Sequence, residues 1–171
     1  MKEYFESYSN LAYNLVGLIA FIVHGDLLFC IALQVLGVGS FTYHWYRKPP
    51  IYLFDWYAMA LVNTVVAGMH FNDDLVWLGL IVWHVVYGYL LMGKINVYAE
   101  VGFSSAIALL AIWLNRSAWT FIIIFLVFLI ALVLRAKDED PKQLRFHDSK
   151  WHSIWHLLTA GGYYLAAYLN V

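Results

Sequence analysis

The chain has 171 residues, of which 63% are hydrophobic and only 12% charged, and its formal net charge is −1. Soluble domains carry about twice that charged fraction, so the composition excludes an ordinary soluble protein. It also excludes a protein that binds nucleic acid through a basic surface, because no stripe of Lys and Arg is present to contact phosphates. A bilayer-spanning helix needs about 20 apolar residues, which leaves room for six or seven spans and no separate soluble domain.

Apolar runs between polar residues predict seven membrane-spanning helices in a single domain, residues 1–171. Pro49 and Pro50 end the second helix and suit the first turn of the third. The first run is short, so its helix is expected to begin within Glu6–Asn10 or to be tilted. The predicted spans are Asn10–Val23, Asp26–Tyr46, Ile51–Phe71, Leu75–Met92, Ile95–Leu114, Ala118–Leu134 and Trp151–Leu169. The predicted fold is therefore an all-α polytopic membrane protein, a seven-transmembrane helix bundle.

The basic residues predict how this bundle is oriented. Nine of the ten Lys and Arg residues fall on the side that holds the N-terminus, and Arg116 alone falls on the other side. The positive-inside rule then places the N-terminus in the cytoplasm. No secretory cleavage site follows the N-terminus, so the first span is expected to stay in the protein. We expect a multi-pass protein of a bacterial inner membrane, or of a eukaryotic endomembrane or plasma membrane.

Two pairs of polar residues at helical spacing lie near one end of this bundle. Ser40 and His44 are four residues apart, as are His152 and His156, so each pair shares one face of a helix. His44 ends the second span and the other two histidines begin the seventh, while Asp55 lies one turn into the third. All are therefore expected at the cytoplasmic end. Ionisable groups are costly at membrane depth, so they indicate a functional site.

Three neutral imidazoles and a water form a catalytic zinc site with an open position. We expect His44, His152 and His156 to bind zinc, which lowers the pKa of a bound water to about 7 and makes hydroxide available as a nucleophile. Asp55 would accept and return the proton. Ser40 would hydrogen-bond a developing oxyanion or orient a ligand. The competing interpretation is that these histidines only lie at the membrane interface, since an isolated H-x-x-x-H pattern is a weak signal.

The same residues resemble a known family. Gly37–His44, which reads G-V-G-S-F-T-Y-H, resembles the G-x-G-S-x-x-[FY]-H signature of alkaline ceramidases, and Asp55 follows His44 by eleven residues. Ser9–Tyr13 is similar to the S-N-x-x-[FY] of that group, and the last span opens with H-x-x-x-H. The chain thus resembles, over its whole length, the CREST superfamily of ceramidases, adiponectin and progestin receptors, and myomaker-like proteins. The resemblance implies seven helices, a zinc held by three histidines, and a serine and an aspartate that assist hydrolysis of a lipid amide.

The chain also departs from the ceramidases. They carry a D-W-x-E-x-N stretch linked to calcium before the first span; the residues before Ser9 do not hold it, so the resemblance does not extend to calcium. Glu3 lies where a further carboxylate of the family falls. The stretch His152–His156, H-S-I-W-H, is closer to the myomaker-like branch. Two functions stay open: a zinc-dependent hydrolase of a lipid amide or ester, which would hold a lipid substrate or a bound fatty acid, and a non-enzymatic receptor or membrane-remodelling protein with structural zinc.

A haem protein or a retinal-type receptor is a third class. Retinal would need a lysine inside the last span, whereas Lys150 lies only at its border. Of the other histidines, His24 and His70 are expected at the far end of the bundle, His84 is expected to face its interior, and His147 is expected in a solvated loop. Glycines expected to allow close helix approach are Gly17, Gly37, Gly39, Gly79, Gly88, Gly161 and Gly162.

Overall fold

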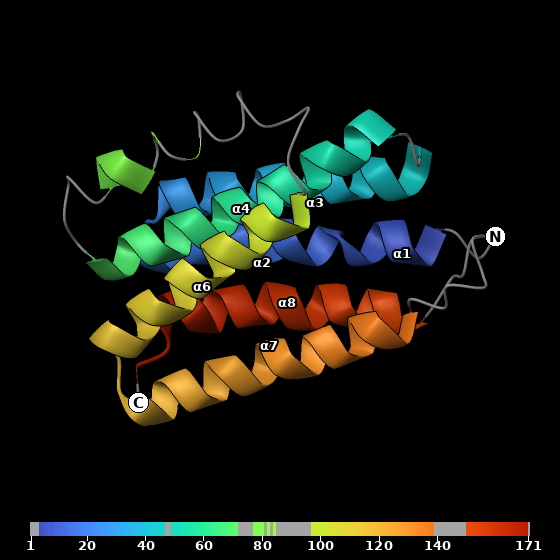
Figure 1. The fold of residues 1–171 in the computed structure, drawn as a ribbon. Helices are drawn as coiled ribbons and strands as arrows, with labels where there is room; N and C mark the ends of the chain where they lie inside the picture. Colours follow the sequence, from blue (N-terminus) through green and yellow to red (C-terminus); the bar gives the residue numbers. More distant parts are fainter. Residues whose placement is uncertain are drawn as a thin grey trace.

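The computed structural model describes residues 4–46, 49–71, 77–80, 82, 84, 97–138 and 150–170. Within these ranges the regular structure is helical throughout, which confirms the predicted all-α class (Figure 1). The predicted span Leu75–Met92 lies largely outside the described residues. The helices are α1 (Tyr4–Ser9), α2 (Leu11–His24), α3 (Leu27–Tyr46), α4 (Pro49–Phe71), α6 (Val97–Asn115), α7 (Ala118–Asp138) and α8 (Lys150–Tyr168).

The helix boundaries follow local sequence signals. α4 begins at Pro49, because proline has a fixed φ suited to the first turn and lacks only an N–H that would be unsatisfied there. α7 continues to Asp138, four residues beyond the predicted end at Leu134. The hydropathy falls at Arg135, but Arg, Ala and Lys are good helix formers, so the helix extends beyond the end of the apolar run.

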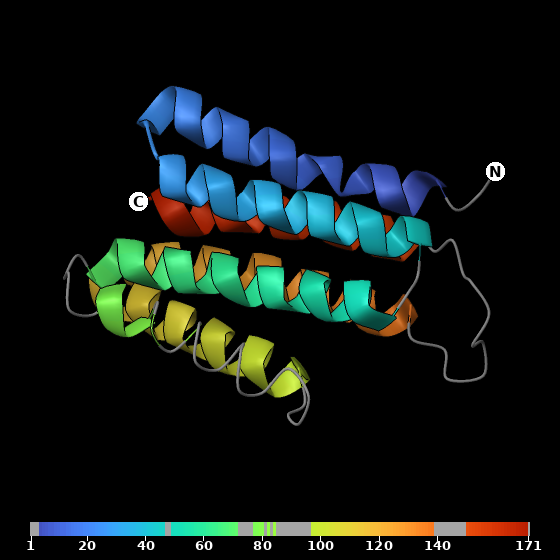
Figure 2. The ribbon, with the colours of Figure 1, turned by 90° about the horizontal axis from the view of Figure 1, so that it is seen from above.

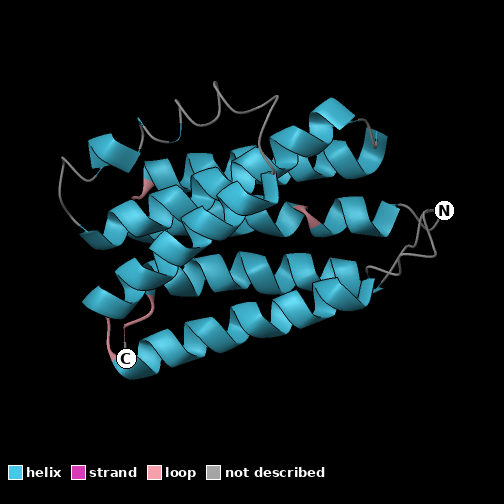
Figure 3. Cartoon of the chain, viewed as in Figure 1, coloured by secondary structure: helices cyan, strands magenta, loops and turns pink. Residues whose placement is uncertain are grey.

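The first predicted span is built from two helices in line. Figure 3 shows the short loop that separates α1 from α2. Asn10 at this break keeps helical backbone angles, with φ −68° and ψ −20°, so the chain continues in nearly the same direction. α1 therefore supplies the length that the short apolar run lacks, and it begins at Tyr4, two residues ahead of the expected range Glu6–Asn10.

A sharp turn reverses the chain between α2 and α3. Gly25 has φ 72°, the left-handed conformation that glycine adopts without a Cβ clash, and its N–H donates to the carbonyl of Phe21 at 2.9 Å. Asp26 then accepts a hydrogen bond from the backbone N–H of Phe29 through Oδ1 at 3.0 Å. This side chain satisfies one of the free N–H groups at the start of α3.

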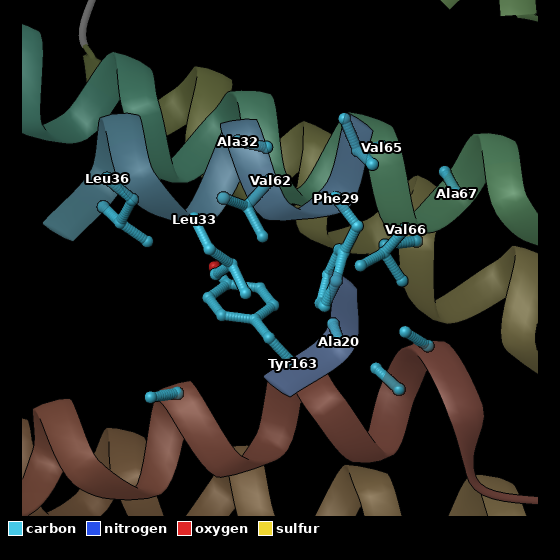
Figure 4. Close-up of a cluster of buried hydrophobic side chains, with 14 of the residues drawn as sticks. Ala20, Phe29, Ala32, Leu33, Leu36, Val62, Val65, Val66, Ala67 and Tyr163 are labelled. Carbon is cyan, nitrogen blue, oxygen red and sulfur yellow. The ribbon is translucent and has the colours of Figure 1, made fainter. Parts of the chain in front are cut away.

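α8 lies against several of the other helices, contacting α1, α2, α4 and α7. Figure 4 shows Tyr163 of α8 in the same buried cluster as Leu33 and Phe29 of α3 and Val62 of α4. Tyr163 is only 4% exposed. Because α8 also carries the H-x-x-x-H pair, the core that fixes α8 also fixes the position of two candidate ligands.

Two of the described helices are long and apolar enough to cross a membrane. They are α3 and the stretch Ala118–Ala136 of α7. Half of the apolar stretch in α3 is buried, against 17% in α7. α7 thus presents most of its apolar side chains to the surroundings. The full set of seven spans stays a prediction.

Four of the glycines lie close to neighbouring atoms, as predicted. A Cβ at Gly17, Gly39 or Gly162 would press on the facing helix, and one at Gly37 would fall on the side chain of Asn14. The prediction was wrong for two others, since a Cβ would meet no described atom within 4 Å at Gly79 or Gly161. Gly88 lies outside the described residues.

Replacing Gly37 with alanine is expected to lower the melting temperature of the detergent-purified protein. The new methyl group would collide with Asn14, whose Nδ2 donates to Oε1 of Gln34 at 2.6 Å, while Gln34 Nε2 donates back to the Asn14 carbonyl at 2.9 Å. Overpacking of this kind costs about 1–3 kcal/mol. Gly161→Ala is the matched control, because its methyl group enters open space. Equal melting temperatures for the two variants would contradict the described contact between α2 and α3.

Candidate metal centre

Three histidines from two helices meet at one end of the bundle. His44 lies in the last turn of α3, while His152 and His156 occupy the first two turns of α8. Their exposed fractions are 7%, 7% and 0%. Each offers a ring nitrogen, and these three atoms all lie within 4.8 Å of one another. The structure thus brings together the three residues that the sequence predicted as ligands.

The geometry of the rings fits a shared ion. Nε2 of His152 lies 3.2 Å from Nε2 of His44. Two nitrogens bound to one tetrahedral zinc at the usual distances are about 3.3 Å apart. The rings are tilted steeply against one another, with centroids 4.5 to 5.1 Å apart and interplanar angles of 69° to 90°. The donor set is therefore suited to a divalent transition metal, whereas calcium prefers oxygen ligands.

A serine from α1 holds one of the imidazoles. Ser9 Oγ lies 2.8 Å from Nδ1 of His156. When Nε2 of this ring binds a metal, Nδ1 carries the hydrogen and donates it to Ser9. The ring of Tyr13 packs edge-on to His156 at 6.0 Å, and its hydroxyl lies 2.5 Å from Oγ1 of Thr159. Sequence reasoning noticed Ser9 and Tyr13 only as a family pattern and assigned them no role in the site.

Ser9→Ala is expected to weaken metal binding about 10- to 100-fold, as for other hydrogen bonds that orient a ligand histidine. A competition titration with a chelator of known affinity measures this change in the purified protein. Ser105→Ala is a matched control, because Ser105 accepts a hydrogen bond from Asn63 at 3.0 Å between α4 and α6. If the Ser9 and Ser105 variants bound the metal equally well, Ser9 would have no role in orienting His156.

A carboxylate and a hydroxyl lie beside the triad formed by His44, His152 and His156. Asp55 of α4 and Ser40 of α3 are 7% and 2% exposed, and the Ser40 hydroxyl donates a hydrogen bond to the Asp55 carboxylate. Asp55 also interacts electrostatically with His44. Its Oδ1 atom is buried and has no hydrogen-bond partner among the described residues. Buried polar atoms without partners are rare and call for an explanation, and a bound water or substrate would supply one.

The other histidines lie elsewhere, as predicted. His24 stacks on the ring of Tyr168 at 3.8 Å, near the end of α8 opposite to the triad. His70 lies at the same end, with Nε2 2.7 Å from the carbonyl of Ala166. His84 is 5% exposed and packs against Tyr57. His147 and Glu3 lie outside the described residues.

An aromatic side chain and a cation complete the surroundings of the triad. The ring of Trp155 lies 5.3 Å from that of His152 and 4.8 Å from that of His156. The guanidinium carbon of Arg135 lies 5.8 Å from the Trp155 ring centroid, and Arg135 interacts electrostatically with Asp55. In the sequence Arg135 was used only to orient the bundle. No local pattern shows that it faces the site, since the contact joins two helices.

Comparison with known proteins identifies no relative of this chain. The chain matches no family model, no curated protein and no solved structure. The triad and its neighbours are therefore the basis on which a function is proposed.

Proposed function

We propose that the protein is a zinc-dependent integral membrane hydrolase that cleaves a lipid amide. The observation that carries the proposal is a buried carboxylate, Asp55, beside a buried triad of histidines. Structural zinc sites are almost always closed by four protein ligands, whereas catalytic sites have three and keep one position for water or substrate. Three histidines with an adjacent carboxylate and hydroxyl correspond to the second arrangement.

In this proposal the chain's own residues move the proton and position the reacting groups. Zinc bound to His44, His152 and His156 supplies an acidic water and a Lewis acid for the amide carbonyl. Asp55 accepts a proton from the attacking water and delivers it to the amine nitrogen as the C–N bond breaks. Ser40 holds the Asp55 carboxylate in place through its hydrogen bond. In the course of the reaction the same hydroxyl hydrogen can instead be donated to the carbonyl oxygen as negative charge develops there. The products are a fatty acid and an amine.

The protein is proposed to span the membrane seven times with its N-terminus in the cytoplasm. The exposed apolar surface of α7 supports this arrangement. Only 17% of its apolar stretch is buried, and exposed apolar side chains are unfavourable in water and favourable in hydrocarbon. α1 and α8 both begin at the end of the bundle that holds the triad (Figure 2). In this orientation the site lies near the cytoplasmic leaflet. The exposed apolar residues of α7 include Ile122, Ile123, Phe125, Leu126, Leu129, Ile130, Leu132 and Val133.

Membership of the CREST superfamily is part of the same proposal. The residues that carry the resemblance, Ser40, His44, Asp55 and the H-x-x-x-H pair, come from three helices and lie together in the fold. The alternative is a non-enzymatic receptor or membrane-remodelling protein in which the metal only joins α3 to α8. The H-S-I-W-H sequence of His152–His156 favours that alternative.

A hydrolysis assay tests the proposal. Zinc-loaded protein in detergent is incubated with a ceramide, an N-acylethanolamine and a phospholipid, and released fatty acid is measured by mass spectrometry. We expect release from at least one lipid amide, loss of release after chelation, and recovery when zinc is added back. Retention of zinc without turnover of any of these lipids would favour the non-enzymatic alternative.

A further inference from the structure

Trp155 differs from two other tryptophans near the triad's end of the bundle. Trp45 and Trp151 are 46% and 45% exposed, as expected for aromatic residues at a membrane interface. Trp155 is more buried, and in the sequence it lies three residues after His152 and one before His156. Its ring packs 5.3 Å from the ring of His152 and 4.8 Å from that of His156, with interplanar angles of 56° and 51°. A role at the membrane interface therefore does not account for this side chain.

Imidazole ligands depend on such neighbours for their orientation. The torsion that turns a histidine ring about its Cβ–Cγ bond has a broad energy profile, so the contacts of the ring decide where its nitrogens point. A hydrogen bond with Ser9 has this effect on His156. The indole of Trp155 contacts both His156 and His152, and tilted aromatic pairs at these distances are favourable. One rigid ring thus limits the rotation of two candidate ligands.

Arg135 of α7 supports this indole from the neighbouring helix. Its guanidinium carbon lies 5.8 Å from the centroid of the Trp155 ring, which is within the range of a cation–π contact. Arg135 is half-buried and also interacts electrostatically with Asp55 of α4. A cation with two such partners has few conformations available, so it provides a fixed support. The contact exists because α7 continues beyond its apolar run to Asp138, which keeps Arg135 on the helix beside α8.

We infer that Trp155 is a positioning residue of the metal centre, which fixes the rings of His152 and His156, and that Arg135 acts on the centre through Trp155. The inference rests on the proposed function, because it requires these histidines to bind zinc. It assigns a role in metal affinity to α7, which supplies none of the three candidate ligands.

The sign of the effect of Arg135 distinguishes this role from a purely electrostatic one. A positive charge near the site repels a divalent cation, so removal of that charge alone would strengthen metal binding. Removal of the support for the Trp155 indole would instead leave the two imidazoles less well oriented. The inference therefore requires metal binding to become weaker when Arg135 is replaced with a neutral residue.

The zinc affinity of the detergent-purified full chain, measured by competition with a chelator of known affinity, tests the inference. We expect Trp155→Leu to weaken zinc binding about tenfold, the lower end of the loss for groups that orient a ligand histidine. Arg135→Gln should weaken it about two- to fivefold, as a cation–π contact allows. Arg135→Lys keeps the cation and should bind zinc as the wild-type protein does. Trp119→Leu is the matched control, because Trp119 is 72% exposed at the start of α7, and it should leave the affinity unchanged.

Two further measurements separate positioning from a general loss of stability. If Arg135 acts through the indole, a double variant with Trp155→Leu and Arg135→Gln binds zinc no more weakly than Trp155→Leu alone, whereas independent effects would multiply. The visible absorption of the cobalt-loaded protein reports the ligand geometry. It should change in Trp155→Leu and stay unchanged in Trp119→Leu. A merely structural role of Trp155 would lower the melting temperature without this change.

Unchanged zinc affinity in a folded Trp155→Leu protein would overturn the inference, as would equal or tighter binding by Arg135→Gln. If the leucine variant did not fold, the sign of the Arg135→Gln effect would decide. Turnover tests the proposed function separately. Zinc binding that depends on Trp155 without any hydrolysis would support this inference and contradict the hydrolase. Zinc-dependent hydrolysis with an affinity that neither variant alters would do the reverse.

Discussion

Replacing His152 with alanine is expected to remove the metal and abolish lipid amide hydrolysis. Two protein ligands would remain, His44 and His156, and these hold a divalent transition metal far more weakly than three do. We expect the zinc content of the purified protein to fall from about one ion to below about 0.1 ion per chain, because the site depends on its full ligand set. Elemental analysis and the fatty acid release assay measure the two effects on the same preparation.

His24→Ala is the control for this experiment. His24 is exposed and stacks on Tyr168 near the opposite end of α8, so its loss should leave the metal content unchanged. A melting curve of each variant separates loss of metal from loss of fold. Full zinc retention by a folded His152→Ala protein would show that the metal lies elsewhere.

Replacing Asp55 with asparagine is expected to abolish turnover while the metal stays bound. Asparagine has the same shape and can still accept the hydrogen bond from Ser40, but it cannot take up a proton at neutral pH. Loss of a general acid–base group slows a reaction about 10²- to 10⁴-fold. Zinc content and melting temperature should stay close to those of the wild-type protein, because Asp55 is not one of the three candidate ligands.

This variant separates the hydrolase from the non-enzymatic alternative. If the metal only joined helices, Asp55→Asn would change no measured property strongly. Asp26→Asn is a matched control at the other end of the bundle, where Asp26 caps α3 and accepts a hydrogen bond from Tyr168 at 3.2 Å. It should affect stability slightly and leave the rate of hydrolysis unchanged. Wild-type rates in a zinc-loaded Asp55→Asn protein would rule out the proposed proton transfer.

The described helices and the candidate ligands were predictable because their signals are local. The ends of α3 and α4 predicted from the apolar runs, which are separated by two prolines, agree with the structure to within two residues. The spacing of His152 and His156 placed both on one face of a helix. Short connections make consecutive helices antiparallel, so the end of the second span and the start of the last span were expected at the same end of the bundle. This placed His44 beside the two histidines of the last span. The end of α7 was not predictable from hydropathy, because the helix continues through residues that are polar but favour helix.

The surroundings of the triad depend on tertiary packing and carry little local signal. Ser9 reaches His156 across 147 residues of sequence. Arg135 meets Trp155 only because α7 and α8 pack side by side (Figure 1). Likewise, the rotation of α8 about its axis decides that Gly162 faces Phe128 of α7 while Gly161 does not. Sequence periodicity alone does not fix which neighbour a given face will meet.

X-ray absorption at the zinc edge of the purified protein tests most directly whether His44, His152 and His156 share one ion. We expect about one zinc per chain, with about three imidazole nitrogens and one further light atom at about 2.0–2.1 Å. A spectrum without imidazole scattering, or one that shows sulfur or six oxygen ligands, would contradict a histidine-bound metal at this site.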